Sequence, residues 1–520
     1  MINISNLSIE TLKGRKLIDN LSFTLNPGDK MAVIGEEGNG KSTLLKAIYD
    51  SSIIADYCSV KGTIDKSKEV IGYLEQKLAP EWHDVRIEDY FLKDTPDGEC
   101  DYSKYELFNK IKRKMKEFGF SEDIFNGDKI VGNLSGGEQV KLQLVKILVN
   151  EPTCLFLDEP TNDLDINTLV WLEDFIQKYE KPLMFISHDE MLLENCANRI
   201  LHIEQLIRKS KPKHTISGCG YQEYVSTRQD WIKKQTQIAY SERRERDKKE
   251  EILRQIKQKV ENSLNASKKD PSNGRIVAKK MANIKAQERK LDEEEMTEIP
   301  DVEEAINMII DPKLTIPSQK QVLNYHLDEL RAGEKHLADN VDLKIYGPER
   351  IAIIGNNGCG KSTLIKKLVP ELRSVGGLRV GYFSQNYFES MDYKKTPVEE
   401  LNLSNGEVNA RTLLGCLKFT PEEMEHAIED LSEGQKAKIL LMKLIVENNN
   451  VLVLDEPTRN LSPLSNPVIR RMLNSYRGAI ITVSHDRRFI SDVCDKVYEL
   501  TPKGLKAVDF KKKRNNEPVM

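Results

Sequence analysis

Short runs of apolar residues recur along this chain, and each run has the length of a β-strand. Strands are predicted at Met1–Ile9, Leu21–Leu25 and Lys30–Ile34 near the start of the chain. Further buried strands are predicted at Cys154–Leu157, Pro182–Ile186, Ile351–Ile354, Val451–Leu454 and Ala479–Val483. Nearly continuous apolar runs are typical of strands covered on both faces, so the pattern predicts an α/β fold.

The middle of the chain follows a different pattern, with sparse apolar residues among good helix formers. Ile238–Leu264 and Ile276–Leu291 are rich in Lys, Arg, Glu, Gln, Ala and Met. Their apolar positions, spaced mostly by three, four or seven, form a narrow seam: Ile252, Leu253, Ile256, Val260, Leu264, Val277, Met281, Ile284 and Leu291. Ala266–Arg275 contains Asp-Pro and Asn-Gly and is predicted to be a turn. We therefore expect an antiparallel two-helix hairpin zipped along the seam.

This hairpin concentrates positive charge in a chain whose net charge is −4. Ile252–Lys290 holds eleven Lys and Arg against three Asp and Glu. A solvated, partly disordered linker is the alternative interpretation, because charged helices are commonly just surface. The one-sided charge favours contact with the phosphates of a polyanion. Lys268, Lys269 and Arg275, clustered at the predicted turn, are the candidate RNA contacts.

Length and composition indicate a multidomain protein of the reducing cytoplasm. At roughly 100–200 residues per domain, the 520 residues are enough for about three domains. The chain has no apolar run of the roughly 18 residues that a membrane helix needs. Met1–Ile4 lacks the basic-then-apolar layout of a signal peptide. The eight cysteines are scattered without CxxC spacing, which argues against a zinc site and a disulfide framework.

Two loops carry the GxxxxGK[ST] pattern of phosphate-binding loops, and each follows a predicted strand. The first, Gly35–Thr43, also opens a predicted helix, Leu44–Tyr49. Glycines let backbone N–H groups wrap phosphates, while Lys41 would reach the outer phosphates and Ser42 would ligate Mg²⁺. The expected ATP-binding residues of the two loops are Gly35, Gly38, Gly40, Lys41, Ser42, Thr43, Gly355, Gly358, Gly360, Lys361, Ser362 and Thr363.

A pair of carboxylates ends one apolar strand in each half of the chain. Asp158 suits the Mg²⁺ shell, and Glu159 is placed to orient or deprotonate an attacking water. His188 follows the next predicted strand, at the carboxyl end where ligands bind in open α/β sheets. The second half repeats these residues as Asp455, Glu456 and His485 at the same spacing. A duplication on this scale predicts two homologous domains.

Further motifs complete a resemblance to ATP-binding cassette (ABC) ATPases. Leu134–Gln139 is similar to the family's signature motif, and Leu431–Gln435 is its counterpart in the repeat. Gln76 and Gln385 resemble the glutamines of the family's Q-loops. Two cassettes without a membrane domain, joined by a basic helical hairpin, resemble the ABC-F subfamily. Only 32 residues separate Thr43 from Gln76. The arm insertion of some members is therefore absent, which favours the bacterial resistance-type branch.

The resemblance implies that the two cassettes close head to tail over two ATP molecules. Site one would use Lys41, Ser42, Gln76, Asp158, Glu159 and His188 with Ser432 and Gly434. Site two would use Lys361, Ser362, Gln385, Asp455, Glu456 and His485 with Ser135, Gly136 and Gly137. Glu159, Glu456, His188 and His485 would be catalytic, and the expected Mg²⁺ shell is Ser42, Gln76, Asp158, Ser362, Gln385 and Asp455.

The resemblance also implies a partner, the ribosome. ABC-F members place the hairpin near the P-site tRNA and the peptidyl-transferase centre, and hydrolysis releases them. Protection of the ribosome against antibiotics, or regulation of translation, is the function expected for this chain, as a monomer that contacts rRNA and P-site tRNA. The domains expected are 1–221, 222–300 for the hairpin, 301–322 as a connecting segment, and 323–520.

This chain departs from the family's pattern in ways that predict unequal sites. Glu433 replaces the first signature glycine of the repeat, and Ser462 stands where the first copy has Asp165. Both changes face site one, which is therefore expected to hydrolyse ATP more slowly than site two. No aromatic residue stands near Leu12 or Ala332, where the family often stacks adenine, so use of GTP stays open.

Two other functions fit the motifs. A tandem ATP-binding subunit of a membrane transporter would carry the same cassettes, but it would leave the basic hairpin without a role. A DNA-associated ABC ATPase would carry a far longer coiled coil inside one cassette, whereas here the insertion lies between cassettes.

Overall fold

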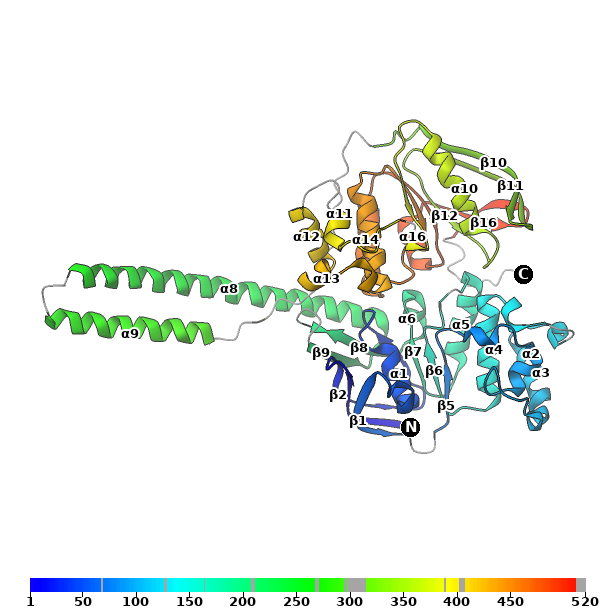
Figure 1. Ribbon diagram of the computed structural model, residues 1–520, viewed down its shortest axis with the longest axis horizontal. Helices are drawn as coiled ribbons and strands as arrows, with labels where there is room; N and C mark the ends of the chain where they lie inside the picture. The colour runs from blue at the N-terminus through cyan, green and yellow to red at the C-terminus, as the bar shows by residue number, and fades with distance from the viewer. Residues whose placement is uncertain are drawn as a thin grey trace. The chain divides into compact units, whose positions relative to one another are not determined.

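The computed structural model describes residues 1–66, 69–125, 129–162, 164–206, 211–266, 271–293, 297, 315–387, 390–401 and 407–510 (Figure 1). The chain divides into two compact units. One unit joins an N-terminal half, Met1–Tyr221, to a C-terminal half, Glu303–Met520. The other unit is the hairpin, Gln222–Val302. The predicted connecting segment, 301–322, lies mostly outside the described residues.

The N-terminal half is built on a mixed sheet in the order β5-β6-β7-β3-β8-β9, and an antiparallel sheet in the order β2-β1-β4 accompanies it. Its strands are β1 (Ile2–Thr11), β2 (Lys16–Leu25), β3 (Lys30–Ile34), β4 (Cys58–Asp65), β5 (Ile71–Leu74), β6 (Cys154–Asp158), β7 (Leu183–Ile186), β8 (Arg199–Gln205) and β9 (Lys211–Ser217). Its helices are α1 (Lys41–Tyr49), α2 (Ile87–Leu92), α3 (Phe108–Glu117), α4 (Gly136–Val149), α5 (Ile166–Lys178) and α6 (Glu190–Cys196).

The C-terminal half repeats the mixed sheet strand for strand, in the order β13-β14-β15-β12-β16-β17, and among the described residues its antiparallel sheet consists of two strands, β10 and β11. Its strands are β10 (Gln321–Ala332), β11 (Lys335–Tyr346), β12 (Arg350–Ile354), β13 (Val380–Phe383), β14 (Val451–Asp455), β15 (Ala479–Val483), β16 (Lys496–Thr501) and β17 (Gly504–Val508). Its helices are α10 (Lys361–Ser374), α11 (Pro397–Leu401), α12 (Glu407–Cys416), α13 (Pro421–Glu425), α14 (Glu433–Val446), α15 (Asn466–Ser475) and α16 (Arg487–Val493). The predicted duplication and α/β fold are confirmed.

The central strands form where the sequence predicts them, because their apolar runs are buried on both faces. β3 matches its predicted range, and Met31–Ile34 within it have no exposed surface. β6 and β14 are likewise buried along their whole length and end in Asp158 and Asp455. Both run parallel to their neighbours, so these aspartates reach the same sheet edge as the loops that follow β3 and β12.

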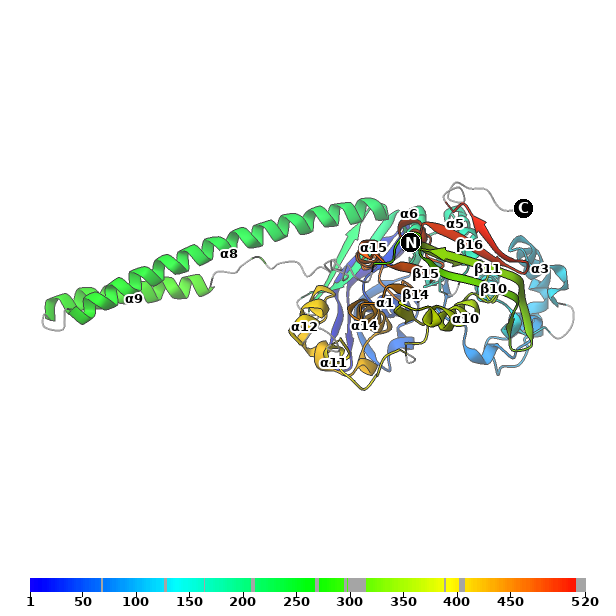
Figure 2. The same ribbon diagram turned by 90° about the horizontal axis from the view of Figure 1, so that it is seen from above.

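The hairpin consists of α8 (Tyr221–Ala266) and α9 (Pro271–Glu293), which lie side by side and antiparallel in both views (Figures 1 and 2). The predicted turn was wrong at one end, since α9 already begins at Pro271. Proline suits the first helical position because its missing N–H has no helical partner there and its φ is preset. Asn273-Gly274 is therefore helical. Lys268 and Lys269 lie outside the described residues, as does the side chain of Arg275.

The seam between α8 and α9 is narrower than predicted. Val260, Ile284 and Leu291 are buried, whereas Ile252 and Ile256 are 57% and 43% exposed. The helix places Leu253 and Val260 on one face and turns Ile252 and Ile256 away from it. Lys257 occupies the seam between them and pairs with Glu288 of α9, Nζ to Oε1, at 2.9 Å. Among the described residues, no helix is long and apolar enough to cross a membrane.

Candidate active site

The first phosphate loop links β3 to α1 and is shaped by its glycines. Gly40 has a φ of 90° immediately before α1, and Gly35 has a φ of 152°. A Cβ at Gly35 would collide with the carbonyl oxygen of Ile203 on β8. The backbone N–H groups of the loop and the start of α1 therefore remain available for an anion, as at other helix N-termini.

Lys41 is buried at the base of this loop. Its Nζ donates to the carbonyl oxygens of Gly35 at 2.9 Å and Glu36 at 3.0 Å. Burial lowers the pKa of Lys41, and carboxylates led by Glu159 oppose that shift. Lys361 makes the same two contacts in the second loop, with Gly355 at 2.8 Å and Asn356 at 3.0 Å. Each half thus holds a buried amine at the place where a bound polyphosphate would bring negative charge.

The residues predicted to hold Mg²⁺ come together at both loops. Ser42 Oγ donates to Asp158 Oδ1 at 2.8 Å, and Ser362 Oγ donates to Asp455 Oδ1 at 3.2 Å. Burial raises the pKa of both aspartates. Hydroxyl and carboxylate oxygens are the donors that Mg²⁺ prefers, so these residues fit the ion. Tyr73 was missed by the sequence reasoning, although its OH donates to Asp158 Oδ2 at 2.9 Å.

Glu159 is the most densely bonded group of the first site. It has a φ of 49°, an uncommon backbone state for a glutamate that is often found at functional sites. Its Oε2 accepts from Gln76 Nε2 and from Asn162 Nδ2, both at 2.7 Å. His188 Nε2 lies 3.2 Å from its Oε1. Burial alone would raise the pKa of Glu159, but the bonds from His188 and Asn162 outweigh it and lower the pKa to about 2.

One contact ties this first site to the other half of the chain. Nδ1 of His188 lies 2.8 Å from the carbonyl oxygen of Leu461, in the loop after Asp455-Glu456. Among the predicted residues, Gln76 touches Glu159 rather than Asp158, so its place in the Mg²⁺ shell stays a prediction. Asn162 and the Leu461 carbonyl were not predicted. For Asn162 the available signal was its position three residues after the catalytic carboxylate.

The second carboxylate, Glu456, shares the unusual backbone state but not the bonding. Its φ is 54°. Its Oε2 accepts from the backbone N of His485 at 3.2 Å, and His485 Nε2 is 3.6 Å from its Oε1. Among the described residues, neither Glu456 Oε1 nor His485 Nδ1 has a hydrogen-bond partner. Burial raises the pKa of Glu456 to about 8 and lowers that of His485 to about 3.

A cavity of about 470 Å³ opens at this second site. Residues of both halves line it, among them Thr161, Asn162, His188, Lys335, Lys361, Ser362, Gln385, Asp455, Glu456, Arg459 and His485. Phe, Tyr and Trp do not contribute to this lining in the described part of the chain. Ser135, Gly136 and Gly137 do not line it either, so their role in site two stays a prediction. Ser135 instead caps α4, accepting from the N–H of Glu138.

In the first site, the phosphate loop lies against the signature motif of the C-terminal half, and a cavity of about 30 Å³ lies between them. Glu37 Oε2 accepts from the backbone N of Gly434 at 2.8 Å, and Glu36 Oε1 pairs with Lys418 Nζ at 3.0 Å. The carboxylate of Glu433 turns away and pairs with Lys436 at 3.0 Å. The negative charge facing this signature thus comes from the phosphate loop.

The two phosphate loops differ at the positions that make these contacts. Glu36 and Glu37 correspond to Asn356 and Asn357 in the second loop. Their importance was missed in the sequence, although the difference between the repeats was a visible signal. A Cβ at Gly434 would lie 2.6 Å from the carbonyl oxygen of Asn460 and 3.2 Å from Glu37 Oε2, so the close approach needs a glycine there.

Comparison with known proteins decides the family. The family profile described as "ABC transporter" matches residues 18–162 and 338–459, which include both phosphate loops, both signature motifs and all four acidic residues of the sites. The chain belongs to the ABC transporter family. Membership in the ABC-F subfamily, predicted from the motifs and the hairpin, is confirmed by relatives that match along the whole chain. The fold and family show that the protein is an ATPase.

Two relatives illustrate this match. The chain is 27% identical to the ABC transporter F family member 5 of Arabidopsis thaliana, with 94% of this chain and 74% of that protein covered. It is 28% identical to the ATP-binding protein Uup of Buchnera aphidicola, with 99% and 84% covered. A crystal structure of archaeal ribosome recycling factor aABCE1 in complex with the ribosomal stalk protein aP1 shares the fold. Its TM-score is 0.56 at 17% identity, covering 94% of this chain and 86% of that one.

The unequal sites predict unequal catalysis. A general base typically contributes about 10²–10⁴-fold to a rate. We expect each substitution to slow its own site by at least about 10², so Glu456→Gln should leave only the turnover of site one, which is predicted to be the slower site. Glu159→Gln should keep most of the turnover. Steady-state phosphate release from the two variants measures this difference, and equal residual rates would contradict it.

Glu37 should weaken nucleotide binding at site one, because a terminal phosphate would compete with its carboxylate for the Gly434 N–H. In a Lys361→Ala background, which silences the second loop, Glu37→Asn should tighten binding of a fluorescent ATP analogue by about tenfold. The reciprocal control, Asn357→Glu in a Lys41→Ala background, should weaken binding at site two. Unchanged or weaker binding by the Glu37→Asn chain would contradict the competition.

Proposed function

We propose that this ATPase is a cytoplasmic ribosome-binding factor. In its ATP-closed state it places the hairpin near the P-site tRNA and the peptidyl-transferase centre, and hydrolysis drives its release. The observation that carries the proposal is a helical hairpin, inserted between two ATPase halves, whose segment Ile252–Lys290 is strongly basic. Protection of the ribosome against antibiotics, or regulation of translation, is the outcome we infer.

The dimensions and charge of the hairpin support contact with RNA. At 1.5 Å per residue, the 23 residues of α9 span about 35 Å. Ile252–Lys290 carries eight net positive charges. A basic rod of this length suits a narrow channel lined by phosphates, where cations displace condensed counterions. Lys268, Lys269 and Arg275 are the contacts we propose, since they cluster where α8 gives way to α9.

The active sites supply a switch for this binding. His188 already contacts the Leu461 carbonyl, and Glu37 contacts the Gly434 N–H, so parts of both halves meet at site one. A ligand that binds one arrangement of two parts better than another shifts their equilibrium. ATP with Mg²⁺, held through Ser42 and Asp158 and through Ser362 and Asp455, would favour the closed arrangement. Bound Mg²⁺ would supply charge neutralisation at the outer phosphates.

The relatives support the ribosome as the partner. ABC-F proteins match the chain along its whole length, and one similar structure is a ribosome recycling factor bound to a ribosomal stalk protein. The alternative, an ATP-binding subunit of a membrane transporter, gives the hairpin no task. Both functions predict ATP binding, so the test must identify the partner that the protein binds.

The partner is tested with the double variant Glu159→Gln, Glu456→Gln, which should bind ATP and remain closed. We expect it to co-sediment with 70S ribosomes in ATP and to stay in the supernatant without nucleotide. The matched control adds Lys41→Ala and Lys361→Ala, which should abolish the ATP effect. A double variant that binds ATP but never pellets with ribosomes would overturn the proposal and direct the search to a membrane partner.

The proposed RNA contacts make a separate prediction. Replacing Lys268, Lys269 and Arg275 by Gln should weaken ribosome binding and flatten its salt dependence, because each lost phosphate contact removes about one unit from the salt slope. A control chain with Lys61, Arg477 and Lys503 replaced by Gln changes the net charge equally at exposed sites of the ATPase halves. Equal salt slopes for the two triple variants would count against the assigned contacts.

A further inference from the structure

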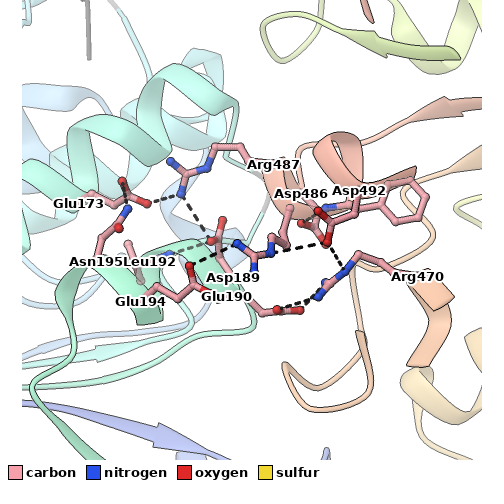
Figure 3. Close-up of polar contacts among 12 residues, drawn as sticks. Glu173, Asp189, Glu190, Leu192, Glu194, Asn195, Arg470, Asp486, Arg487 and Asp492 are labelled. Atoms are coloured by element: carbon pink, nitrogen blue, oxygen red, sulfur yellow. Dashed lines mark hydrogen bonds and ion pairs between the residues drawn. The ribbon is translucent and has the colours of Figure 1, made fainter. Parts of the chain in front are cut away.

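Four charged residues are buried where the N-terminal and C-terminal halves meet (Figure 3). Arg470 of α15 binds Glu190 of α6 through two nitrogens, with NH1–Oε1 at 2.5 Å and NH2–Oε2 at 3.0 Å. Arg487 of α16 binds Glu173 of α5 and lies 3.5 Å from Asp189 Oδ1. Each of the four, Glu173, Glu190, Arg470 and Arg487, is less than 10% exposed. We call them the interface quartet.

The two contacts of the quartet are the same contact made twice. Glu173 and Arg470 are separated by 297 residues, as are Glu190 and Arg487, and as are the repeated carboxylates Glu159 and Glu456. Glu173 and Arg470 are therefore equivalent positions in the two halves, and so are Glu190 and Arg487. In each contact, the position of Glu173 and Arg470 in one half meets the position of Glu190 and Arg487 in the other half. All the acids lie in the N-terminal half, and all the arginines lie in the C-terminal half.

The neighbouring side chains follow the same sorting. Asn195 and Asp492 are also equivalent positions. Asn195 Nδ2 donates to Glu173 Oε2 at 3.1 Å, while Asp492 Oδ2 pairs with Arg470 Nε at 3.1 Å. The same position thus holds a hydrogen-bond donor, Asn195, beside Glu173 in the N-terminal half. In the C-terminal half it holds an acceptor, Asp492, beside Arg470. Two identical halves could not hold both side chains at this position.

The sorting has a physical consequence for pairing. Two N-terminal halves in the same arrangement would bury Glu173 against Glu190, and two C-terminal halves would bury Arg470 against Arg487. Like charges would then repel at close range, and each would also lose hydration without a partner. Built-in repulsion against wrong partners is a common route to specificity.

We propose that the interface quartet is a pairing code, which admits an N-terminal half only against a C-terminal half and rejects pairs of like halves between chains. The partner selected is the complementary half. The half in the same chain is favoured because the covalent connection raises its effective concentration. The code keeps a chain with two mutually similar ATPase surfaces from assembling into dimers through the wrong faces.

The test uses full chains with the code reversed in one half at a time. Glu173→Arg with Glu190→Arg gives a chain whose two halves both present arginines, and Arg470→Glu with Arg487→Glu gives a chain whose halves both present acids. Light scattering should find one chain per particle for the wild type and for each variant alone. Mixed in equal amounts, the two variants should form a particle of two chains, which the wild type does not form with either.

A fourth chain carries all four substitutions and is the control for misfolding caused by the substitutions themselves. Each two-residue variant should unfold at a lower temperature than the wild type. The four-residue reversal should regain part of that loss, because opposite charges again face each other across the interface, while the unchanged Asp189 and Asp492 would lie beside introduced carboxylates. The control variant Glu349→Lys with Lys496→Glu reverses a more exposed pair inside the C-terminal half and should neither dimerise nor associate. A mixture that stays at one chain per particle would overturn the proposal. So would a four-residue reversal that is no more stable than either two-residue variant.

Discussion

Charge cannot be buried alone, and the contact between the two ATPase halves is built on that constraint. Arg470 and Arg487 lie in the interior of the joined halves, where Glu190 and Glu173 of the other half neutralise them. Breaking such a pair is costly, typically about 3–5 kcal/mol, because the remaining charge keeps its desolvation penalty. The helices that carry these residues follow directly after the catalytic carboxylate and histidine of each half. The same segments therefore hold the halves together and present the reactive groups.

The residues of the ATP sites and the residues that pair the two halves lie close together along the chain. His188 follows the end of β7 and precedes Glu190 by two residues, so the ion pair to Arg470 also holds His188 against the C-terminal half. There its Nδ1 meets the Leu461 carbonyl, and its Nε2 meets Glu159. A shift of one half against the other would change both contacts. A nucleotide that shifted one half against the other would therefore act on these contacts.

Duplication supplied both halves with the same parts, but the two sites differ in bonding. Glu159 accepts from Gln76, Asn162 and His188. Among the described residues, the side chain of Glu456 accepts one hydrogen bond, from the backbone N of His485, and it lies beside a large cavity. Arg459 stands where the first half has Asn162, which removes one amide donor. The first phosphate loop also presents acids to the opposite signature, where the second loop has amides. These differences favour one site that is mostly an interface and another that is mostly catalytic.

Local patterns made much of this predictable, and non-local contacts made the rest unpredictable. The phosphate loops, the buried strands and the carboxylate pairs that follow them were found because each depends on a short stretch with fixed spacing. The hairpin was found by its helical periodicity, but its turn was misplaced because Asn273-Gly274 follows a proline that starts α9. Tyr73, the Leu461 carbonyl and the interface quartet were missed, since each acts on a residue distant in sequence. Comparison of the two repeats, position by position, would have revealed the charge sorting of the quartet.

The central claim is that nucleotide-controlled pairing of the halves positions the hairpin on the ribosome. Electron cryomicroscopy of the Glu159→Gln, Glu456→Gln chain, bound with ATP to 70S ribosomes that carry P-site tRNA, tests it most directly. The account predicts closed ATPase halves with two nucleotides and the hairpin, Gln222–Val302, beside the acceptor end of the tRNA. A bound chain whose hairpin touches neither tRNA nor rRNA would contradict it.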